Sequence, residues 1–354
     1  MRFSVSDIKT DDDLVVSGKT VRIGTSGNKK FKTPLKPSIK TSKNNCAVHE
    51  IYRIAKPQTL EKCLNSTEYD SKYCRTTNNL RDESAVNIFS LAYGDKTHIP
   101  NDNLIRIMAD LQYVNTDVIV IPSWYDLISR NEKDKSELYL KLSDKYYEYA
   151  SFKNHKPVMA TIPVCMPSPE IPKVLDHFME MNITSFIIDF NARSLMNGTW
   201  LRNFSRELNP YRTEKEGILY SINAFPGIDR KHVGYVEAKD FIGFAAGFDI
   251  VGDKHTPKQS SDNYNSPRTT INLFNNNTYR YDKVPFVEGK QDDIKLASVQ
   301  NQINEMTALR TSLDESESIK KILDTKSLEP TTMRDLISMK SDQRIRVTRL
   351  NQFI

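Results

Sequence analysis

Apolar runs and amphipathic stretches alternate along most of this chain. Runs of mostly apolar residues lie at Val86–Ala92, Asp117–Ser123, Pro157–Val164, Thr184–Phe190, Ile218–Phe225 and Phe248–Val251. Stretches with apolar positions at helical spacing lie at Asn103–Tyr113, Asp134–Tyr149, Glu170–Met181, Trp200–Leu208 and His232–Ala246. Strands that are apolar on both faces are typical of a parallel sheet covered by helices. Their alternation with helices indicates repeated βαβ units.

The number of these units predicts the fold class. The six apolar runs, with one or two further strands in the first forty residues, approach the eight strands of a (β/α)8 TIM-type barrel. We therefore predict an α/β fold, with residues 1–298 forming the barrel and an N-terminal hairpin. Helical patterns at Ile294–Leu323 and Met333–Met339 predict a small helical C-terminal appendage, residues 299–354. A doubly wound open sheet is the alternative, although no Gly-x-Gly-x-x-Gly turn follows a strand.

Polar residues gather where the last predicted strand ends. A strand, a helix beginning near His232 and a second strand are followed by Gly252-Asp253-Lys254-His255. Gly247 is expected to stop the helix, because glycine adopts positive φ freely. In a parallel α/β fold, ligands and catalytic groups collect at the carboxyl ends of the strands. We expect one mouth to carry the residues that end five strands, namely Asp95, Trp124, Asp189, Asn223 and Asp253.

The charge pattern leaves two interpretations open. The 354 residues include 50 Lys and Arg against 45 Asp and Glu, a net charge of +5. Eight basic residues and no acidic residue lie between Lys19 and Lys43, and Arg344, Arg346 and Arg349 form a similar run. Basic clusters of this kind are the footprint of a polyanion partner. They are equally typical of the solvated surface of a lysine-rich protein.

Several classes of protein are excluded by what the sequence does not contain. No apolar run reaches the roughly 18 residues of a membrane span. Met1–Val5 is not followed by the apolar stretch that a secretory signal peptide contains. We expect no membrane partner and a cytoplasmic protein, in the host cytoplasm if a phage encodes it. The four cysteines, Cys46, Cys63, Cys74 and Cys165, are too widely spaced for a CxxC metal site. We therefore expect no metal and no cofactor.

Two blocks of the chain resemble the tRNA-guanine transglycosylase superfamily. Gly18–Gly24 and Phe31–Ser38 are similar to the hairpin and the Thr-Pro strand that open the family's barrel. A second block runs from Leu219 through Gly247 to Asp253 and then Thr256-Pro257-Lys258. The last Asp of the family's block is its nucleophile.

The register of the second block assigns two aspartates. The resemblance places the nucleophile on Asp253, and Asp249 matches the first Asp of the block. By strand alternation, Asp249 and Asp253 share a face, so Asp249 is the competing choice of nucleophile.

Departures from the family point to one of its branches. Tyr93-Gly94-Asp95 stands where the family has an Asp-Ser-Gly-Gly-Phe-Gln strand end, and no cysteine follows Cys165 to build the family's zinc site. Such divergence is closest in character to the branch that inserts 7-deazaguanine bases into phage or bacterial DNA. The resemblance implies exchange of guanine in DNA, rather than tRNA, for a base such as 7-cyano-7-deazaguanine. A homodimer or companion modification proteins are open as partners.

Base exchange requires a carboxylate that attacks C1′ and an acid/base for the purine protons. The candidate catalytic residues are Asp253, Asp249 and Asp95. The candidate substrate-binding residues are Trp124, Tyr125, Asp126, Asp189, Asn191, Asn223, Phe225, Lys254 and His255. Aromatic rings can stack on a purine, and strand-end amides can hydrogen-bond it. The competing interpretations are helix capping for the acids and rim packing for the aromatics.

Three alternative functions stay open at this stage. One is a transglycosylase that acts on tRNA. Another is an inactive barrel that serves as a nucleic-acid-binding subunit. The third is a Schiff-base aldolase in which Lys254, beyond a strand end, attacks a carbonyl.

Overall fold

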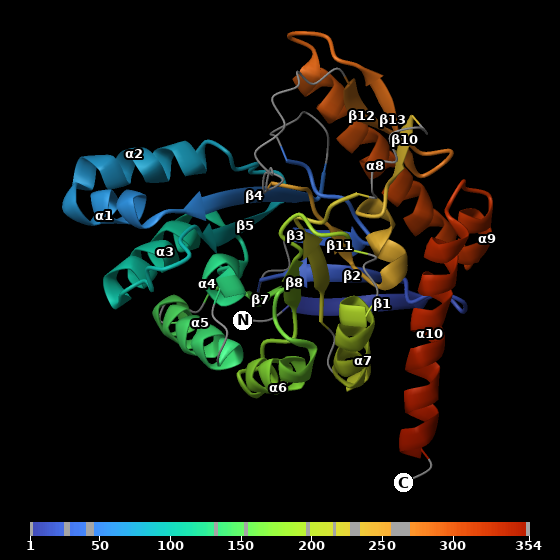
Figure 1. Cartoon of the computed structure of the whole chain (residues 1–354), viewed down its shortest axis with the longest axis horizontal. Coiled ribbons are helices and arrows are strands. Elements are labelled where there is room, and N and C mark those ends of the chain that lie inside the picture. Colours follow the sequence, from blue (N-terminus) through green and yellow to red (C-terminus); the bar gives the residue numbers. More distant parts are fainter. Residues whose placement is uncertain are drawn as a thin grey trace.

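The structure is a computed structural model, and it describes residues 3–24, 29–39, 46–130, 134–151, 155–195, 199–214, 217–226, 234–255 and 270–351. Within these ranges the chain is a mixed α/β protein with parallel strands covered by helices (Figure 1). No helix among the described residues combines the length and the hydropathy needed to cross a membrane.

The chain opens with a three-stranded antiparallel sheet. Its strands are β1 (Phe3–Thr10), β2 (Ser17–Ile23) and β3 (Lys29–Thr33), paired in the order β1-β2-β3. Alternation along β2 and β3 buries Val21, Ile23 and Phe31 on one face, as expected for a sheet with one solvated side. These side chains join a hydrophobic cluster with Ile187 and Ile250 of the parallel strands. The N-terminal sheet therefore packs on one end of the parallel strands.

Seven parallel strands follow. They are β4 (Val48–Ala55), β5 (Val86–Tyr93), β6 (Ile119–Ile121), β7 (Val158–Pro163), β8 (Phe186–Asp189), β9 (Leu219–Ile222) and β11 (Ile250–Val251). Strands β4 and β5 form one pair, and the other five form a sheet in the order β11-β9-β8-β7-β6. Isolated parallel bridges join Ile88 of β5 to Val118 and Ala92 to Ser123, beside β6. The segment 34–38 bridges β11 through Leu35 and β4 through Ser38.

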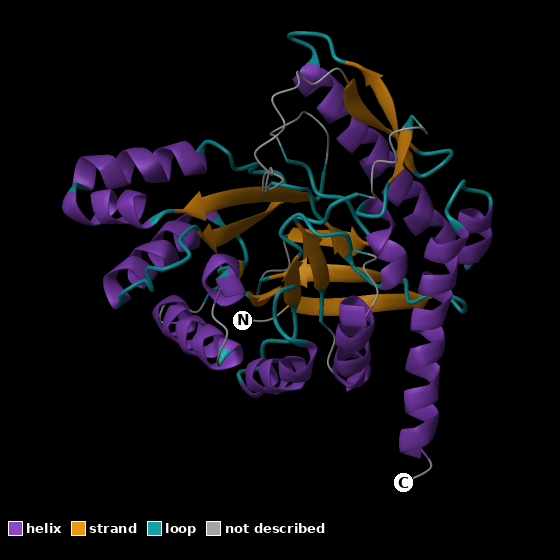
Figure 2. Ribbon diagram, in the orientation of Figure 1, coloured by secondary structure: helices purple, strands orange, loops and turns teal. Residues whose placement is uncertain are grey.

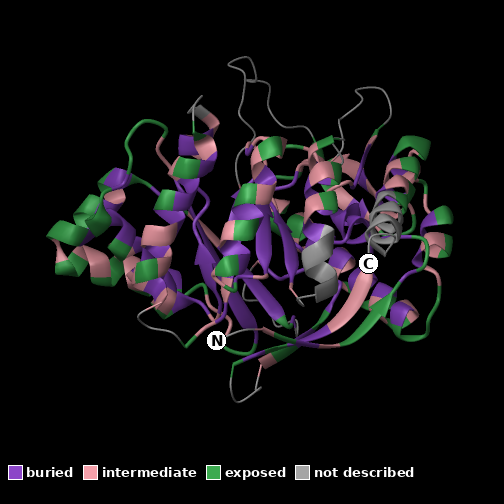
Figure 3. Ribbon diagram, turned by 90° about the horizontal axis from the view of Figure 1, so that it is seen from below, coloured by how far each residue is buried: buried purple, intermediate pink, exposed green. Residues whose placement is uncertain are grey.

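Helices cover the outer face of these strands (Figures 1 and 2). They are α1 (Pro57–Asn65), α2 (Thr67–Asn78), α3 (Asp102–Asn115), α4 (Tyr125–Arg130), α5 (Lys135–Ser151), α6 (Ile171–Glu180) and α7 (Thr199–Glu214), with a 3-10 turn η1 (Ser168–Glu170) before α6. Along β6, Ile119 and Ile121 belong to the core beneath the helices, whereas Val120 and the preceding Val118 belong to the inner cluster. The strands are thus apolar on both faces, and Figure 3 shows them almost wholly buried between helices with exposed outer faces.

A second, antiparallel sheet lies beside the long helix α8 (Gln291–Asp314), as Figure 2 shows. Its strands are β10 (Tyr235–Glu237), β12 (Thr270–Asn275) and β13 (Arg280–Pro285), in the order β10-β13-β12. The remaining elements are the 3-10 helix η2 (Phe241–Ala246) and the helices α8 (Gln291–Asp314), α9 (Ile319–Asp324) and α10 (Pro330–Asn351). Phe241 joins the sheet to η2, since its ring centroid lies 4.5 Å from that of Phe274 and 5.2 Å from that of Tyr279.

The six predicted strands are confirmed, and so are four of the five predicted helices between them. The helix predicted over His232–Ala246 is wrong. Tyr235–Glu237 instead pairs with Arg280–Asp282 as a strand, and only Phe241–Ala246 turns, as a 3-10 helix. His232 and Val233 lie outside the described residues. The expected boundary at residue 298 falls inside α8, whose Leu309 and Leu313 pack in the main core.

Candidate functional site

The carboxyl ends of the parallel strands bring a set of polar side chains together. Strands β8, β9 and β11 end near Asp189, Asn223 and Asp253, and Tyr52 lies within β4. His255 follows β11, and Lys36 comes from the segment that bridges β4 and β11. Hydrogen bonds connect these residues across strands, so they form one cluster. We call it the strand-end cluster.

Lys36 holds the Asp253 carboxylate. Lys36 Nζ lies 2.9 Å from the Gly252 carbonyl oxygen and 3.3 Å from Asp253 Oδ1. The Lys36 side chain is 2% exposed, whereas that of Asp253 is 29% exposed. Burial alone would raise the Asp253 pKa, but the charges of Lys36 and His255 bring it below its ordinary value. Asp253 is therefore an ionised carboxylate with one side open to solvent.

Glu50 of β4 orients both Asp253 and His255. Its Oε1 accepts a hydrogen bond from the Asp253 backbone N–H at 2.9 Å and lies 2.5 Å from His255 Nε2. The Tyr52 ring stacks on the His255 imidazole at a centroid distance of 4.9 Å and an angle of 9°. Burial alone would lower the His255 pKa, but the Glu50 charge and hydrogen bond raise it. The imidazolium form is thus stabilised beside Asp253.

Gly252 leaves room for the Glu50 carboxylate. A Cβ added at Gly252 would lie 2.4 Å from Glu50 Oε2 and 2.6 Å from the Ser221 carbonyl oxygen. Real Cβ atoms do not approach neighbours this closely, so a side chain at residue 252 would displace Glu50. Glu50 Oε2 itself is buried and has no hydrogen-bond partner among the described residues.

Asp189 and Asn223 form the inner wall of the strand-end cluster. Asp189 accepts hydrogen bonds from Ser123 Oγ at 2.5 Å and from Asn223 Nδ2 at 2.9 Å. Asn223 Oδ1 accepts a hydrogen bond from the His255 backbone N–H at 2.9 Å, and Asn223 has a φ of 58°. Burial raises the Asp189 pKa. Because Asp189 is buried and fully engaged, it positions Asn223 and the loop after β11.

Asp240, just before η2, is a second carboxylate within range of the charges of the strand-end cluster. Burial raises the Asp240 pKa to about 6, while the Lys36 charge lowers it and the Asp253 charge raises it further. The Tyr281 hydroxyl donates a hydrogen bond to Asp240 Oδ2 at 2.7 Å, whereas Oδ1 is buried and has no partner among the described residues. Asp253 and Asp240 thus have pKa values shifted in opposite directions, a pattern that separates a nucleophile from an acid/base in other active sites.

Three predicted site residues do not join the strand-end cluster. Asp249 precedes β11 and pairs with Lys19 of the N-terminal sheet at 2.9 Å. Its carboxylate also accepts the Leu219 backbone N–H at the start of β9, so Asp249 lies at the amino ends of the strands, away from Asp253. Asp95 is half-exposed and caps the turn at Thr97. Trp124 is fully buried against Tyr93, so its ring offers no face to a purine.

The other candidates lie around the strand-end cluster. Tyr125 is buried, shares a side-chain hydrogen bond with Asn191, and has a pKa raised by burial. Asp126 is close enough to raise the pKa values of Tyr52 and Asp189. Lys254 Nζ lies 4.9 Å from the centroid of the Phe225 ring, and both residues are half-exposed. That exposure leaves Lys254 solvated, unlike the desolvated lysine that an aldolase requires.

Internal ion pairs engage much of the basic segment from Lys19 to Lys43. Lys19, Lys29, Lys32 and Lys36 pair with Asp249, Asp117, Asp314 and Asp253. Lys40 and Lys43 lie outside the described residues, as does Thr256-Pro257-Lys258. The described part of the segment is therefore no continuous free basic surface.

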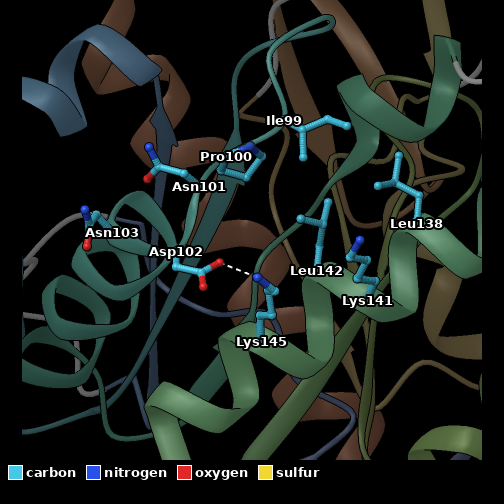
Figure 4. A pocket seen from close by; sticks show the side chains of 9 residues that line it. All are labelled: Ile99, Pro100, Asn101, Asp102, Asn103, Leu138, Lys141, Leu142 and Lys145. Atoms are coloured by element: carbon cyan, nitrogen blue, oxygen red, sulfur yellow. Dashed lines mark hydrogen bonds and ion pairs between the residues drawn. The ribbon is translucent and has the colours of Figure 1, made fainter.

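Two further cavities lie among the described residues, and Lys36 of the strand-end cluster lines one of them. One, of about 470 Å³, lies between the start of α3 and α5, where Lys145 pairs with Asp102 (Figure 4). The other, of about 390 Å³, lies between β3 and α8. Among the described residues, no three or more His, Cys, Asp or Glu side chains group as metal ligands.

The sequence interpretation missed five members of the site. They are Lys36, Glu50, Tyr52, Ser123 and Asp240. Polar residues interrupt β4 (Val-His-Glu-Ile-Tyr-Arg-Ile-Ala), and Asp240 lay within the expected helix. The only available signals were that Lys36 follows the Thr-Pro pair of the first block and that Ser123 ends an expected strand.

Comparison with known proteins identifies no family. No protein-family model matches the sequence, and no curated protein matches it either. Function is therefore inferred from the geometry of the strand-end cluster.

Proposed function

We propose that the parallel strands close into an eight-stranded (β/α)8 barrel. Its first strand is the segment 34–38, which bridges β11 on one side and β4 on the other. The N-terminal sheet covers the amino ends of the strands, where Lys29 Nζ reaches the Ala85 carbonyl oxygen just before β5. The strand-end cluster then lies at the opposite mouth, which is where TIM-barrel enzymes carry their active sites.

We infer that this mouth catalyses base exchange in a polynucleotide, replacing guanine in DNA with a 7-deazaguanine base. The observation that carries this proposal is Asp253, an ionised carboxylate that is open to solvent beside a buried cation. Attack of a carboxylate on C1′, with an oxocarbenium-like transition state, is the chemistry of retaining glycosidases. The choice of DNA over tRNA rests on the sequence departures from the tRNA enzymes.

The reaction divides between two carboxylates. An Asp253 oxygen bonds to C1′ while the C1′–N9 bond breaks and its electron pair goes to the purine. Asp240, whose pKa of about 6 leaves a protonated fraction near neutral pH, gives the departing guanine its proton. The N9–H of the incoming base then returns a proton to Asp240 as N9 bonds to C1′ and releases Asp253. Glu50 holds His255 beside Asp253, and the positive charge of His255 keeps the Asp253 carboxylate ionised.

The remaining residues shape the purine pocket. Tyr52 lines the mouth next to His255, and Phe225 offers a half-exposed ring, whereas Asn223 is buried and holds the His255 backbone. This set replaces Trp124 as the source of stacking and hydrogen bonds. Asp189 and Ser123 act through Asn223 and do not touch the purine.

The direct test is nucleoside mass spectrometry of DNA and tRNA from cells that express the chain and are supplied with 7-cyano-7-deazaguanine. We expect a 7-deazaguanine nucleoside in DNA, absent with Asp253→Asn and retained with Asp95→Asn, since Asp95 only caps a turn. The nucleoside in tRNA alone would transfer the proposal to a tRNA enzyme. Its absence from both pools would favour an inactive binding subunit.

A further inference from the structure

The cavity of about 390 Å³ between β3 and α8 has the composition of an anion-binding site. The charged residues that line it are all basic, namely Lys30, Lys32, Lys36 and Arg310. In the cavity of Figure 4, by contrast, the lining acid Asp102 already neutralises Lys145. A lining with cations and no acid favours a ligand that brings negative charge.

Two of these cations are available to a ligand. Lys36 is engaged by Asp253, and Lys32 pairs with Asp314 at 2.9 Å. Arg310 donates hydrogen bonds to the Pro34 carbonyl oxygen at 2.9 Å and to Thr307 Oγ1 at 2.8 Å, and pairs with no carboxylate among the described residues. A guanidinium has five N–H donors, so further donors remain for a phosphate. Lys30 is exposed and likewise forms no ion pair with a described residue.

The rest of the lining combines apolar side chains with the hydroxyls of Thr20 and Thr307. Phe31 and Leu35 are buried, and half-buried Ile303 of α8 also lines the cavity. Small-molecule sites span about 300–1,000 Å³ and combine apolar walls with a few polar groups. A cavity of this volume therefore accommodates an anionic head together with a flat apolar body.

We propose that this cavity binds a phosphate ester with a flat base, of the size of a nucleoside monophosphate, through Arg310 and Lys30. The proposal does not depend on base exchange at the barrel mouth. A free nucleotide and a nucleotide of a DNA strand share this chemistry, and the experiment below separates them.

The cavity is linked to the strand-end cluster through the segment 34–38. Arg310 bonds the Pro34 carbonyl oxygen, and Cys46 Sγ lies 3.5 Å from the Lys36 carbonyl oxygen. Lys36 in turn holds Asp253. A ligand bound by Arg310 therefore contacts the segment that carries Lys36, the residue that pairs with Asp253.

Cys46 provides a reporter, because this buried cysteine is one of the residues that line the cavity. The purified chain is titrated calorimetrically with inorganic phosphate, guanosine monophosphate and a short single-stranded oligodeoxynucleotide, and alkylation of each cysteine by iodoacetamide is followed by mass spectrometry. We expect saturable binding of guanosine monophosphate that slows alkylation of Cys46 by about tenfold or more. Cys74 and Cys165, half-buried elsewhere, should react at unchanged rates.

Matched variants locate the contact. Arg310→Gln and, with the fold less affected, Lys30→Gln should each weaken binding, whereas Lys72→Gln on α2, exposed and remote from the cavity lining, should not. Protection of Cys46 by the oligonucleotide alone would assign the same phosphate site to a DNA strand. Absence of binding by all three probes, or binding that leaves the Cys46 rate unchanged, would overturn the proposal.

Discussion

Replacement of Lys36 by methionine tests how strongly the buried cation holds Asp253. Methionine keeps the apolar stem and removes the charge. At the 3.3 Å between Lys36 Nζ and Asp253 Oδ1, Coulomb's law with an effective dielectric constant of about 20 gives about 5 kcal/mol. Because solvent reaches the Asp253 side chain, water compensates part of this interaction energy when Lys36 is removed. Breaking a buried ion pair by removing one partner costs about 3–5 kcal/mol. We expect Lys36→Met to lower the free energy of unfolding by about 2–4 kcal/mol.

The matched control is Lys32→Met. Lys32 pairs with Asp314 at 2.9 Å, but the two side chains are 56% and 50% exposed, so the loss should be below about 1 kcal/mol. Urea denaturation of the two variants and the wild type measures both values. Equal losses in the two variants would refute the claim that burial makes Lys36 different.

The same variant makes a prediction about pH. The lowered Asp253 pKa contributes stability that is present above the unfolded value of 3.8 and is lost as pH falls through the folded pKa. In Lys36→Met the Asp253 pKa rises, since its main stabilising charge is gone. The acid limb of the exchange rate should therefore move to higher pH.

Three further substitutions test other parts of the site. Glu50→Gln should lower the pKa of His255, because it removes the charge that raises it. An NMR titration of the imidazole protons measures this pKa. The wild type should lose stability as pH rises from 6.5 through the raised folded pKa of His255, and the variant should lack that slope in urea denaturation. Gly252→Ala should lower the free energy of unfolding by about 1–3 kcal/mol or more, because the added Cβ displaces Glu50. Thermal unfolding measures the loss. An unchanged midpoint would contradict the close approach of residue 252 to Glu50 Oε2. Asp240→Asn should abolish the exchange of guanine but retain the release of 7-methylguanine. The methylated base already carries a positive charge in the nucleoside, so it leaves without a proton from Asp240. Equal loss of activity with both bases would contradict the role of Asp240 as the acid.

The sequence predicted the parallel strands well because burial on both faces leaves a local signature. In the run Ile218–Phe225, for example, Leu219 packs in the core beneath the helices, whereas Tyr220 and Ile222 pack in the inner cluster. Strand β4 lacked that signature, since Glu50 and Tyr52 face the site rather than the core. The helix prediction around Val236 was wrong for a different reason. The buried positions of this segment fit helical spacing, whereas pairing with β13, some forty residues later in the chain, made it a strand.

The site was harder to predict because its contacts are long-range. Asp249 and Asp253 look equivalent by alternation along one strand. What separates them is Lys19, 230 residues away, which binds Asp249, and Lys36, 217 residues away, which binds Asp253. No local pattern encodes either pair. The pKa shift of Asp240 likewise comes from burial under elements that the sequence did not bring together.

The measurement that tests the central claim most directly is detection of the covalent intermediate. The purified chain is incubated with guanine-containing DNA without an incoming base, denatured, and examined by peptide mass spectrometry. We expect an adduct in which the Asp253 carboxylate is esterified by the deoxyribose C1′, absent in Asp253→Asn and retained in Asp95→Asn. An adduct on another residue, or base exchange without any adduct at Asp253, would contradict its role as the nucleophile.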